Sequence, residues 1–263
     1  MQVFFWGFLS VFLAFSVWPG NIETMQQEFI AATQTTVQAY HFEFFLMLAL
    51  ALVGTRLPVV RRPLMWFEVY FHEISHGLAT LFTFGRPVKL ELHWRGSGLL
   101  VSRGGLSVPI LFAGYSGAVL WGLLIYLCGV YSNTHTGEVI LTLLLVLIGL
   151  TVLLLVRNIT TLLILLIIAG TLFAPFHLQQ THLGPVLLQF IGLSVGLNAI
   201  KAPLHLIDGK SEGDGAELFK RTLIPEGVWI LLWFSLGVLG ILYMWQLPLP
   251  PEARTLVFLP FLT

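Results

Sequence analysis

The chain of 263 residues has little charge and only one cysteine. Charged residues make up 10% of it, whereas soluble domains carry about 25%. The single cysteine, Cys128, excludes a disulfide framework and a metal site held by several thiolates. The formal net charge is zero and no run of basic residues occurs, which excludes nucleic-acid binding. Hydrophobic residues at 57% and a mean hydropathy of +0.88 indicate a polytopic membrane protein.

Long apolar stretches take the place of the missing charge. They lie at about 3–18, 42–55, 64–84, 106–131, 138–156, 158–176, 184–200 and 227–246. The first is followed by Pro19-Gly20-Asn21 rather than by a small-residue cleavage site, so we expect a retained helix. The pattern predicts an all-α polytopic protein, a single membrane domain over residues 1–263, with about six or seven transmembrane helices.

The most informative motif is His72-Glu73-Ile74-Ser75-His76, an H-E-x-x-H pattern inside an apolar stretch. On a helix the two histidines lie four residues apart on one face, where both imidazoles can bind one zinc ion. The glutamate between them can act as general base toward a zinc-bound water. Two histidines that hydrogen-bond to backbone carbonyls are the alternative, but ionisable residues in apolar surroundings are costly and usually functional. The motif therefore predicts a zinc site that performs hydrolysis within or beside the bilayer.

The lysines and arginines are grouped, and the grouping predicts the topology. Twelve of the thirteen occur in 56–62, 86–103 and 201–221 and at Arg157, and none occurs in 19–41, 132–137 or 177–183. The positive-inside rule places the first set on the cytoplasmic side and the second set outside. Both flanks of the H-E-x-x-H segment are then cytoplasmic. We therefore expect a helix that enters the membrane without crossing it.

A short β-hairpin is expected directly after this helix. Residues 88–94 alternate between apolar and polar, Gly96-Ser97-Gly98 is a turn signal, and residues 99–102 suit a returning strand. The edge of such a hairpin could pair with an extended substrate, which makes Leu90 and Leu92 candidate substrate contacts. A plain connecting ribbon is equally compatible with the sequence.

The chain has only two aspartates, Asp208 and Asp214, and both fall in the basic segment 201–221. A catalytic zinc ion generally takes three protein ligands and leaves a fourth position for water. The charge pattern puts this segment on the same side of the membrane as the paired histidines. Either aspartate could therefore supply the third ligand. Glu212 and Glu217 of the same segment are also available, and a solvated loop carboxylate is the alternative for each.

These motifs together resemble the site-2 protease family of zinc intramembrane metallopeptidases, and more closely a compact bacterial branch of it. The resemblance covers about 65–235 and includes a late D-x-x-x-L-x-x-x-T-x-x-P-x-x-V-W element. The matching residues are His72 to His76 with Leu81 and Gly85, Gly114-Tyr115-Ser116-Gly117 with Trp121-Gly122, Arg157-Asn158, and Asp214 with Leu218, Thr222, Pro225, Val228 and Trp229. The resemblance divides the single membrane domain into N-terminal helices at 1–62, a metallopeptidase-like core at 63–235, and the end of the last helix with a tail at 236–263.

The resemblance also implies roles for individual residues. His72, His76 and one aspartate would hold one Zn²⁺ per chain, while Glu73 would take a proton from the bound water and deliver it to the leaving amine. Asp214 is favoured because it keeps the spacing of the late element, and Asp208 is the alternative because Ile207-Asp208-Gly209 imitates the family's Leu-Asp-Gly.

Asn198 is a further candidate. By its likeness to the family's asparagine it could steady an oxyanion or the substrate backbone. A helix–helix hydrogen bond is the alternative role.

The expected function is that of a zinc metalloendopeptidase acting on membrane-associated protein substrates. Its expected partners are such a substrate and the lipid bilayer, and its expected location is the bacterial inner (cytoplasmic) membrane with the active site toward the cytoplasm. The oligomeric state stays open. A non-catalytic scaffold would not need the general base Glu73. A metal-handling transporter would spread ionisable residues over several spans, whereas 106–131 and 138–156 contain almost none.

Overall fold

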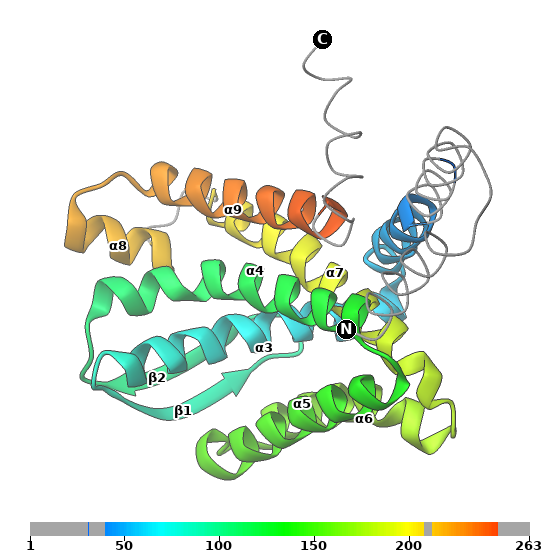
Figure 1. Cartoon of the computed structure of the whole chain (residues 1–263). Helices are drawn as coiled ribbons and strands as arrows, with labels where there is room; N and C mark the ends of the chain where they lie inside the picture. Colours follow the sequence, from blue (N-terminus) through cyan, green and yellow to red (C-terminus); the bar gives the residue numbers. More distant parts are fainter. Residues whose placement is uncertain (1–30, 32–39, 208–211, 247–263) are drawn as a thin grey trace, which may run out of the picture. The chain divides into compact units, whose positions relative to one another are not determined.

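The structure is a computed structural model that describes residue 31, residues 40–207 and residues 212–246 (Figure 1). The chain divides into a unit of Glu43–Pro248 and a unit of Met1–Phe42 with Leu249–Thr263. All labelled elements belong to the first unit, whereas the apolar stretch 3–18 lies outside the described residues. The labelled elements are α3 (Pro58–Phe82), β1 (Arg86–Leu92), β2 (Gly98–Arg103), α4 (Ser107–Tyr131), α5 (Thr134–Leu155), α6 (Ile159–His177), η1 (Thr181–Leu183), α7 (Gly184–Lys201), η2 (Ala202–Leu206), α8 (Asp214–Thr222) and α9 (Glu226–Gln246).

Five helices in the described part of the chain are long and apolar enough to cross a membrane. They are α4, α5, α6, α7 continued by η2, and α9. The helix Tyr40–Gly54 and α3 satisfy the same criterion only together, and they bend by 106° at the short break between them. Because of this bend, the pair does not form one straight helix through the bilayer. It is either a broken span or a re-entrant segment. The protein is therefore an all-α polytopic integral membrane protein with a small antiparallel hairpin, as the sequence predicts.

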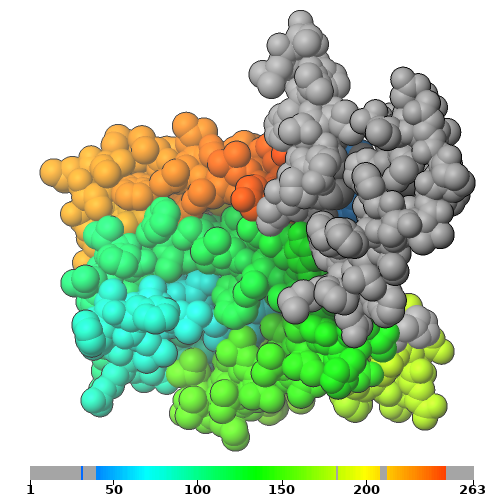
Figure 2. Space-filling model, viewed as in Figure 1, coloured from blue at the N-terminus to red at the C-terminus, as the bar shows by residue number. Residues whose placement is uncertain are grey.

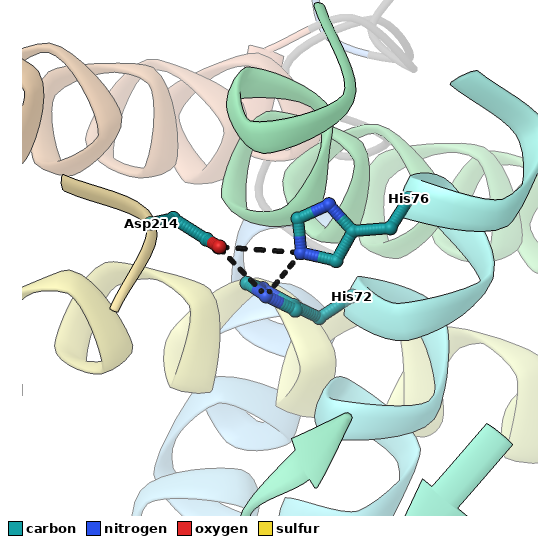
Figure 3. Close-up of side chains that lie close together, drawn as sticks. All are labelled: His72, His76 and Asp214. Carbon is teal, nitrogen blue, oxygen red and sulfur yellow. Dashed lines mark hydrogen bonds and ion pairs between the residues drawn. The ribbon is translucent and has the colours of Figure 1, made fainter. Parts of the chain in front are cut away.

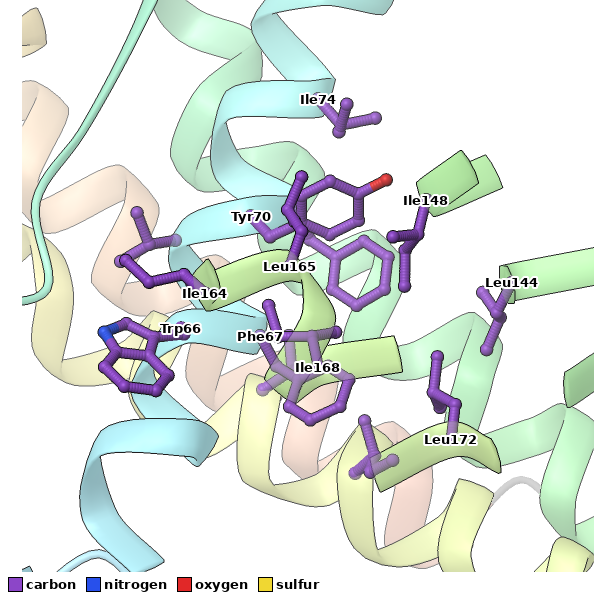
Figure 4. Packing of buried hydrophobic residues seen from close by; sticks show 14 of the residues in the cluster. Trp66, Phe67, Tyr70, Ile74, Leu144, Ile148, Ile164, Leu165, Ile168 and Leu172 are labelled. Atoms are coloured by element: carbon purple, nitrogen blue, oxygen red, sulfur yellow. The ribbon is translucent and has the colours of Figure 1, made fainter. Parts of the chain in front are cut away.

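The helix α3 carries the H-E-x-x-H motif and has two contrasting faces. It begins at Pro58, whose missing N–H is harmless in the first turn. One face is buried against α5 and α6, where Phe67 and Tyr70 pack beside Ile148 and Leu165 (Figure 4). The Tyr70 hydroxyl also lies 3.0 Å from the Thr151 hydroxyl. This packing fixes the rotation of α3, so its polar face points the other way.

The hairpin of β1 and β2 follows α3 and pairs Arg86 with Arg103 at its open end. Its register is irregular between Pro87 and Lys89. The other edge of β1 is attached to the helical core. The Leu92 N–H donates to the Thr161 hydroxyl at 2.8 Å, and Leu90 forms a parallel bridge with Val156. Because β1 is held on both sides, β2 is the strand with a free edge, one that pairs with no other strand in the described part of the chain.

Glycines let α4 pack closely on α7, with α3 on one side of α4 and α9 on the other (Figures 1 and 2). A Cβ at Gly122 would lie 2.9 Å from the Gly196 backbone nitrogen, and one at Gly192 would lie 2.4 Å from the Tyr126 nitrogen. Small residues of this kind promote helix association in membranes, because they let two helix backbones pack closely. The hydrophobic effect does not drive this association, since lipid tails are as apolar as the helix surfaces. The tight α4–α7 contact forms the central layer to which α3, α8 and α9 attach.

Candidate metal centre

The periodicity of α3 places the two histidines of the motif side by side (Figure 3). His72 and His76 are one helical turn apart, their ring centroids are 4.6 Å apart, and their Nε2 atoms are 3.0 Å apart. This part of the geometry is local, because an α-helix brings residues i and i+4 to the same face.

The third group of the cluster comes from α8, more than 130 residues later in the chain. One oxygen of Asp214, Oδ2, lies 3.2 Å from the Nε2 atom of His72 and 3.2 Å from that of His76. Gly213 allows this approach, since its φ of 94° suits glycine and turns the chain so that α8 begins at Asp214. Among the described residues, these three form a group able to hold a metal ion.

The spacing of the three atoms fits zinc. A tetrahedral zinc ion with ligands at about 2.0–2.1 Å separates those ligands by about 3.3 Å, close to the 3.0 Å and 3.2 Å found here. Three acceptor atoms this near to one point repel one another unless a cation or a proton lies between them. Two imidazoles and a carboxylate are also a donor set that zinc favours.

The backbone of α4 orients one of the imidazoles. His76 Nδ1 lies 2.6 Å from the carbonyl oxygen of Ile110, and this contact requires a proton on Nδ1, which donates to the carbonyl. The lone pair of His76 Nε2 is therefore left free to face the cluster. Metal-binding histidines usually have such a partner for their second nitrogen.

Gly114 of α4 leaves the space that an ion needs. A Cβ at this position would lie 2.5 Å from His76 Nε2 and 2.6 Å from His72 Nε2, within the cluster itself. In the sequence Gly114 belongs to the Gly114-Tyr115-Ser116-Gly117 stretch, and Gly117 of that stretch packs against Ser75. The role of Gly114 beside the histidines has no local sequence signal other than its place in the family-like Gly-Tyr stretch.

Electrostatics keep Asp214 ready to bind a cation. Burial alone would raise the pKa of its carboxyl group, but the hydrogen bonds and charges of His72 and His76 outweigh burial and hold that pKa below its ordinary value. The group is therefore deprotonated at neutral pH, as a metal ligand must be.

Glu73 is buried beside the cluster, with 5% of its surface exposed. The backbone N–H of Leu100 donates to its carboxylate. A Cβ at Gly98 would lie 2.5 Å from Glu73 Oε1, so the start of β2 lies directly against this side chain. The free edge of β2 therefore lies against Glu73, the acidic residue of the H-E-x-x-H motif.

A cavity of about 1110 Å³ connects these groups. Its walls come from the polar face of α3, from β2 and from parts of α4, α7 and α8, and all three residues of the cluster line it together with Glu73. Tyr115 also lines it and holds its ring edge-on to the His72 imidazole, with a centroid distance of 4.4 Å. A cavity of this size, lined by apolar side chains as well as by charged and polar ones, can admit water and a segment of polypeptide.

The other candidate residues from the sequence differ in how they lie relative to the cavity. Asn198 lines the cavity, and its side-chain amide donates to the Leu64 carbonyl oxygen at 3.3 Å, which is the helix–helix hydrogen bond expected as its alternative role. Leu90 and Leu92 are 0% and 1% exposed and pack in the core. Their side chains are therefore not available to a substrate, and the strand that lines the cavity is β2 instead. Asp208 lies outside the described residues.

Taken together, the helical membrane fold and the His-His-Asp cluster beside a buried glutamate fit the class of intramembrane metallopeptidases. The family model described as Peptidase M50B-like matches residues 45–244, and the chain belongs to this family, within the site-2 protease group. The comparison with curated proteins and the comparison with solved structures each find no significant match.

Proposed function

We propose that this protein is a zinc-dependent metalloendopeptidase that hydrolyses peptide bonds of membrane-associated polypeptides. The observation that carries the proposal is the convergence of His72, His76 and Asp214 with Glu73 in one cavity of a helical membrane protein. A structural pair of histidines would need neither the aspartate nor the buried glutamate.

Each residue of the cluster has a distinct task in this reaction. His72, His76 and Asp214 bind one zinc ion, which would lower the pKa of a water molecule and polarise the carbonyl of the scissile bond. The Glu73 carboxylate accepts a proton from the attacking water and passes it to the leaving nitrogen. The Leu100 N–H holds that carboxylate in place. Gly114 keeps the space between the histidines open.

The free edge of β2 is suited to bind the substrate. A peptide bond within a helix is inaccessible, because its carbonyl and N–H are hydrogen-bonded inside the helix. An extended segment added to β2 would expose its peptide bonds beside Glu73 and gain backbone hydrogen bonds. This role belongs to the backbone of β2, and the buried side chains of Leu90 and Leu92 do not contribute to it.

We also propose that the protein lies in the bacterial cytoplasmic membrane with this cavity open toward the cytoplasm. The support is the distribution of basic residues, since 56–62, 86–103 and 201–221 all carry lysine or arginine. The expected partners are a membrane protein substrate and the surrounding lipid.

Replacement of the general base tests the peptidase function. We expect Glu73→Gln protein, purified in detergent, to keep about one zinc ion per chain and to lose cleavage of a mixed dodecapeptide library by at least about 100-fold. Metal content is measured by atomic emission and cleavage by mass spectrometry. Glu138→Gln is the matched control, because Glu138 lies on α5 outside the cavity lining. Unchanged cleavage by the Glu73→Gln protein would rule out this mechanism.

A further inference from the structure

The cavity that contains the metal centre also has a strongly basic end, formed by Arg56, Arg61 and Lys201. Lys201 Nζ lies 3.4 Å from the Thr55 hydroxyl. Arg56 and Arg61 are near enough to repel the Lys201 ammonium group. These three residues come from the break before α3, from the first turns of α3 and from the end of α7.

No carboxylate among the described residues forms an ion pair with any of these three cations. Three other basic side chains in the described part of the chain do form such ion pairs: Lys89 with Glu91, and Lys220 and Arg221 with Glu217. Arg56 and Arg61 are exposed and Lys201 is half-buried. The carboxylates that line the same cavity are Glu68, Glu73, Asp214 and Glu217, and none of them pairs with these cations. Three like charges placed together in this way repel one another and give this end a positive potential. Such a site attracts an anion.

The basic end and the metal centre lie along one face of α3. The residues of α3 that line the cavity recur at helical spacing and are Arg61, Met65, Glu68, Val69, His72, Glu73 and His76. Arg62, next in sequence to Arg61, does not line the cavity. A general anchoring role at the membrane surface would not select one of two adjacent arginines in this way.

Helix geometry sets the distance between the two ends. Arg61 and Glu73 are twelve residues apart in α3, which runs on through Pro63, so their backbone positions are about 18 Å apart along its axis. An extended peptide spans about 3.3 Å per residue. A chain bound along this face would therefore reach the basic end about five residues from the bond that lies at Glu73.

We propose that Arg56, Arg61 and Lys201 bind a carboxylate of the substrate, from an aspartate, a glutamate or the C-terminus, about five residues from the cleaved bond. This inference rests on the proposed peptidase function. Polypeptides carry their negative charge chiefly as carboxylates, and a guanidinium fork binds a carboxylate through two parallel hydrogen bonds. The site would thus select the position of cleavage by charge.

The test uses the full-length, zinc-loaded protein in neutral detergent and a series of amidated dodecapeptides built on one cleaved sequence. A single glutamate is moved along the series, and each peptide is compared with its glutamine counterpart. We expect kcat/KM to be highest, by roughly tenfold over glutamine, when the glutamate is about five residues from the bond. A peptide with a free C-terminus at that distance distinguishes a terminal from a side-chain carboxylate. Equal cleavage of glutamate and glutamine peptides at every position would overturn the inference.

Charge reversal shows whether these cations are responsible. Arg61→Glu and Lys201→Glu should each remove the preference for glutamate and favour lysine at the same position, whereas Arg62→Glu makes the same change in charge and should leave the preference intact. A gain with lysine peptides also shows that the variants are folded. If Arg61→Glu keeps the preference for glutamate, the assignment is wrong.

Binding measured without hydrolysis distinguishes this inference from the peptidase proposal. The Glu73→Gln protein should bind a fluorescein-labelled glutamate peptide more tightly than its glutamine counterpart, and adding Arg61→Glu should abolish the difference. Selective binding without any cleavage by the unmodified protein would refute the peptidase function and support the carboxylate site. In nanodiscs, Arg61-dependent retention of phosphatidylglycerol without peptide selectivity would show a lipid headgroup as the occupant and overturn the inference.

Discussion

At the scale of single residues, the proposed metal site depends on the missing side chain of Gly114 as much as on His72, His76 and Asp214. Gly114 faces both Nε2 atoms, and a Cβ there would lie 2.5 Å from that of His76 and 2.6 Å from that of His72. We expect Gly114→Ala to lower the zinc affinity by at least about 100-fold while the helical circular dichroism stays unchanged. Gly170→Ala is the control, because nothing lies within 4 Å of a Cβ at that position. Zinc titration against a competing chelator measures both proteins.

The choice between the two aspartates is also a question about single residues. Asp214 touches both histidines, so Asp214→Ala should remove bound zinc after dialysis, whereas Asp208→Ala should keep about one ion per chain. The metal content of the two purified proteins is the measurement. Loss of zinc in Asp208→Ala alone would show that the other carboxylate closes the site.

At the scale of elements, α3 and β2 divide the work of the site. The helix supplies the histidines and the glutamate on one face and a large apolar contact on the other, while the strand presents a free backbone edge to Glu73. A displacement of β2 should therefore affect cleavage more than metal binding.

Gly98→Ala tests this division, because its Cβ would fall 2.5 Å from Glu73 Oε1 and force the strand and the carboxylate apart. We expect zinc binding to be retained and kcat/KM to fall by roughly 100-fold, since small misplacements of catalytic groups reduce rates strongly. Gly170→Ala is again the control. Equal losses of zinc and activity would indicate that β2 supports the metal centre instead.

At the scale of the whole molecule, the number of spans between two positions predicts their sides of the membrane. The three helices α5, α6 and α7 separate Thr134 from Lys220, so these residues should lie on opposite sides. Single cysteines are introduced at both positions in a Cys128→Ser background and labelled with an impermeant maleimide in intact bacterial cells. We expect labelling at position 134 and none at position 220.

A third cysteine, at position 62, tests whether α3 crosses the membrane. If α3 enters without crossing, position 62 shares the side of position 220 and stays unlabelled in intact cells. Labelling at position 62 would mean that α3 crosses the membrane. The proposed cytoplasmic location of the cavity would then be wrong.

The sequence by itself determined the features that depend on composition and local periodicity. Its low charge identified a membrane protein, the four-residue spacing of His72 and His76 put both imidazoles on one helix face, and the alternation after α3 indicated the hairpin. These properties follow from the geometry of one helix or strand. They do not depend on where distant segments lie.

Only the tertiary structure decided which groups meet across long stretches of chain. It brought Asp214 of α8 to the histidines, placed Gly114 of α4 where an ion needs room, and buried Leu90 and Leu92 while turning β2 toward Glu73. No local pattern encodes these contacts, because they result from how α4 packs on α3 and α7 and from how β1 attaches to the core. The same packing unites the basic end and the metal centre in one cavity.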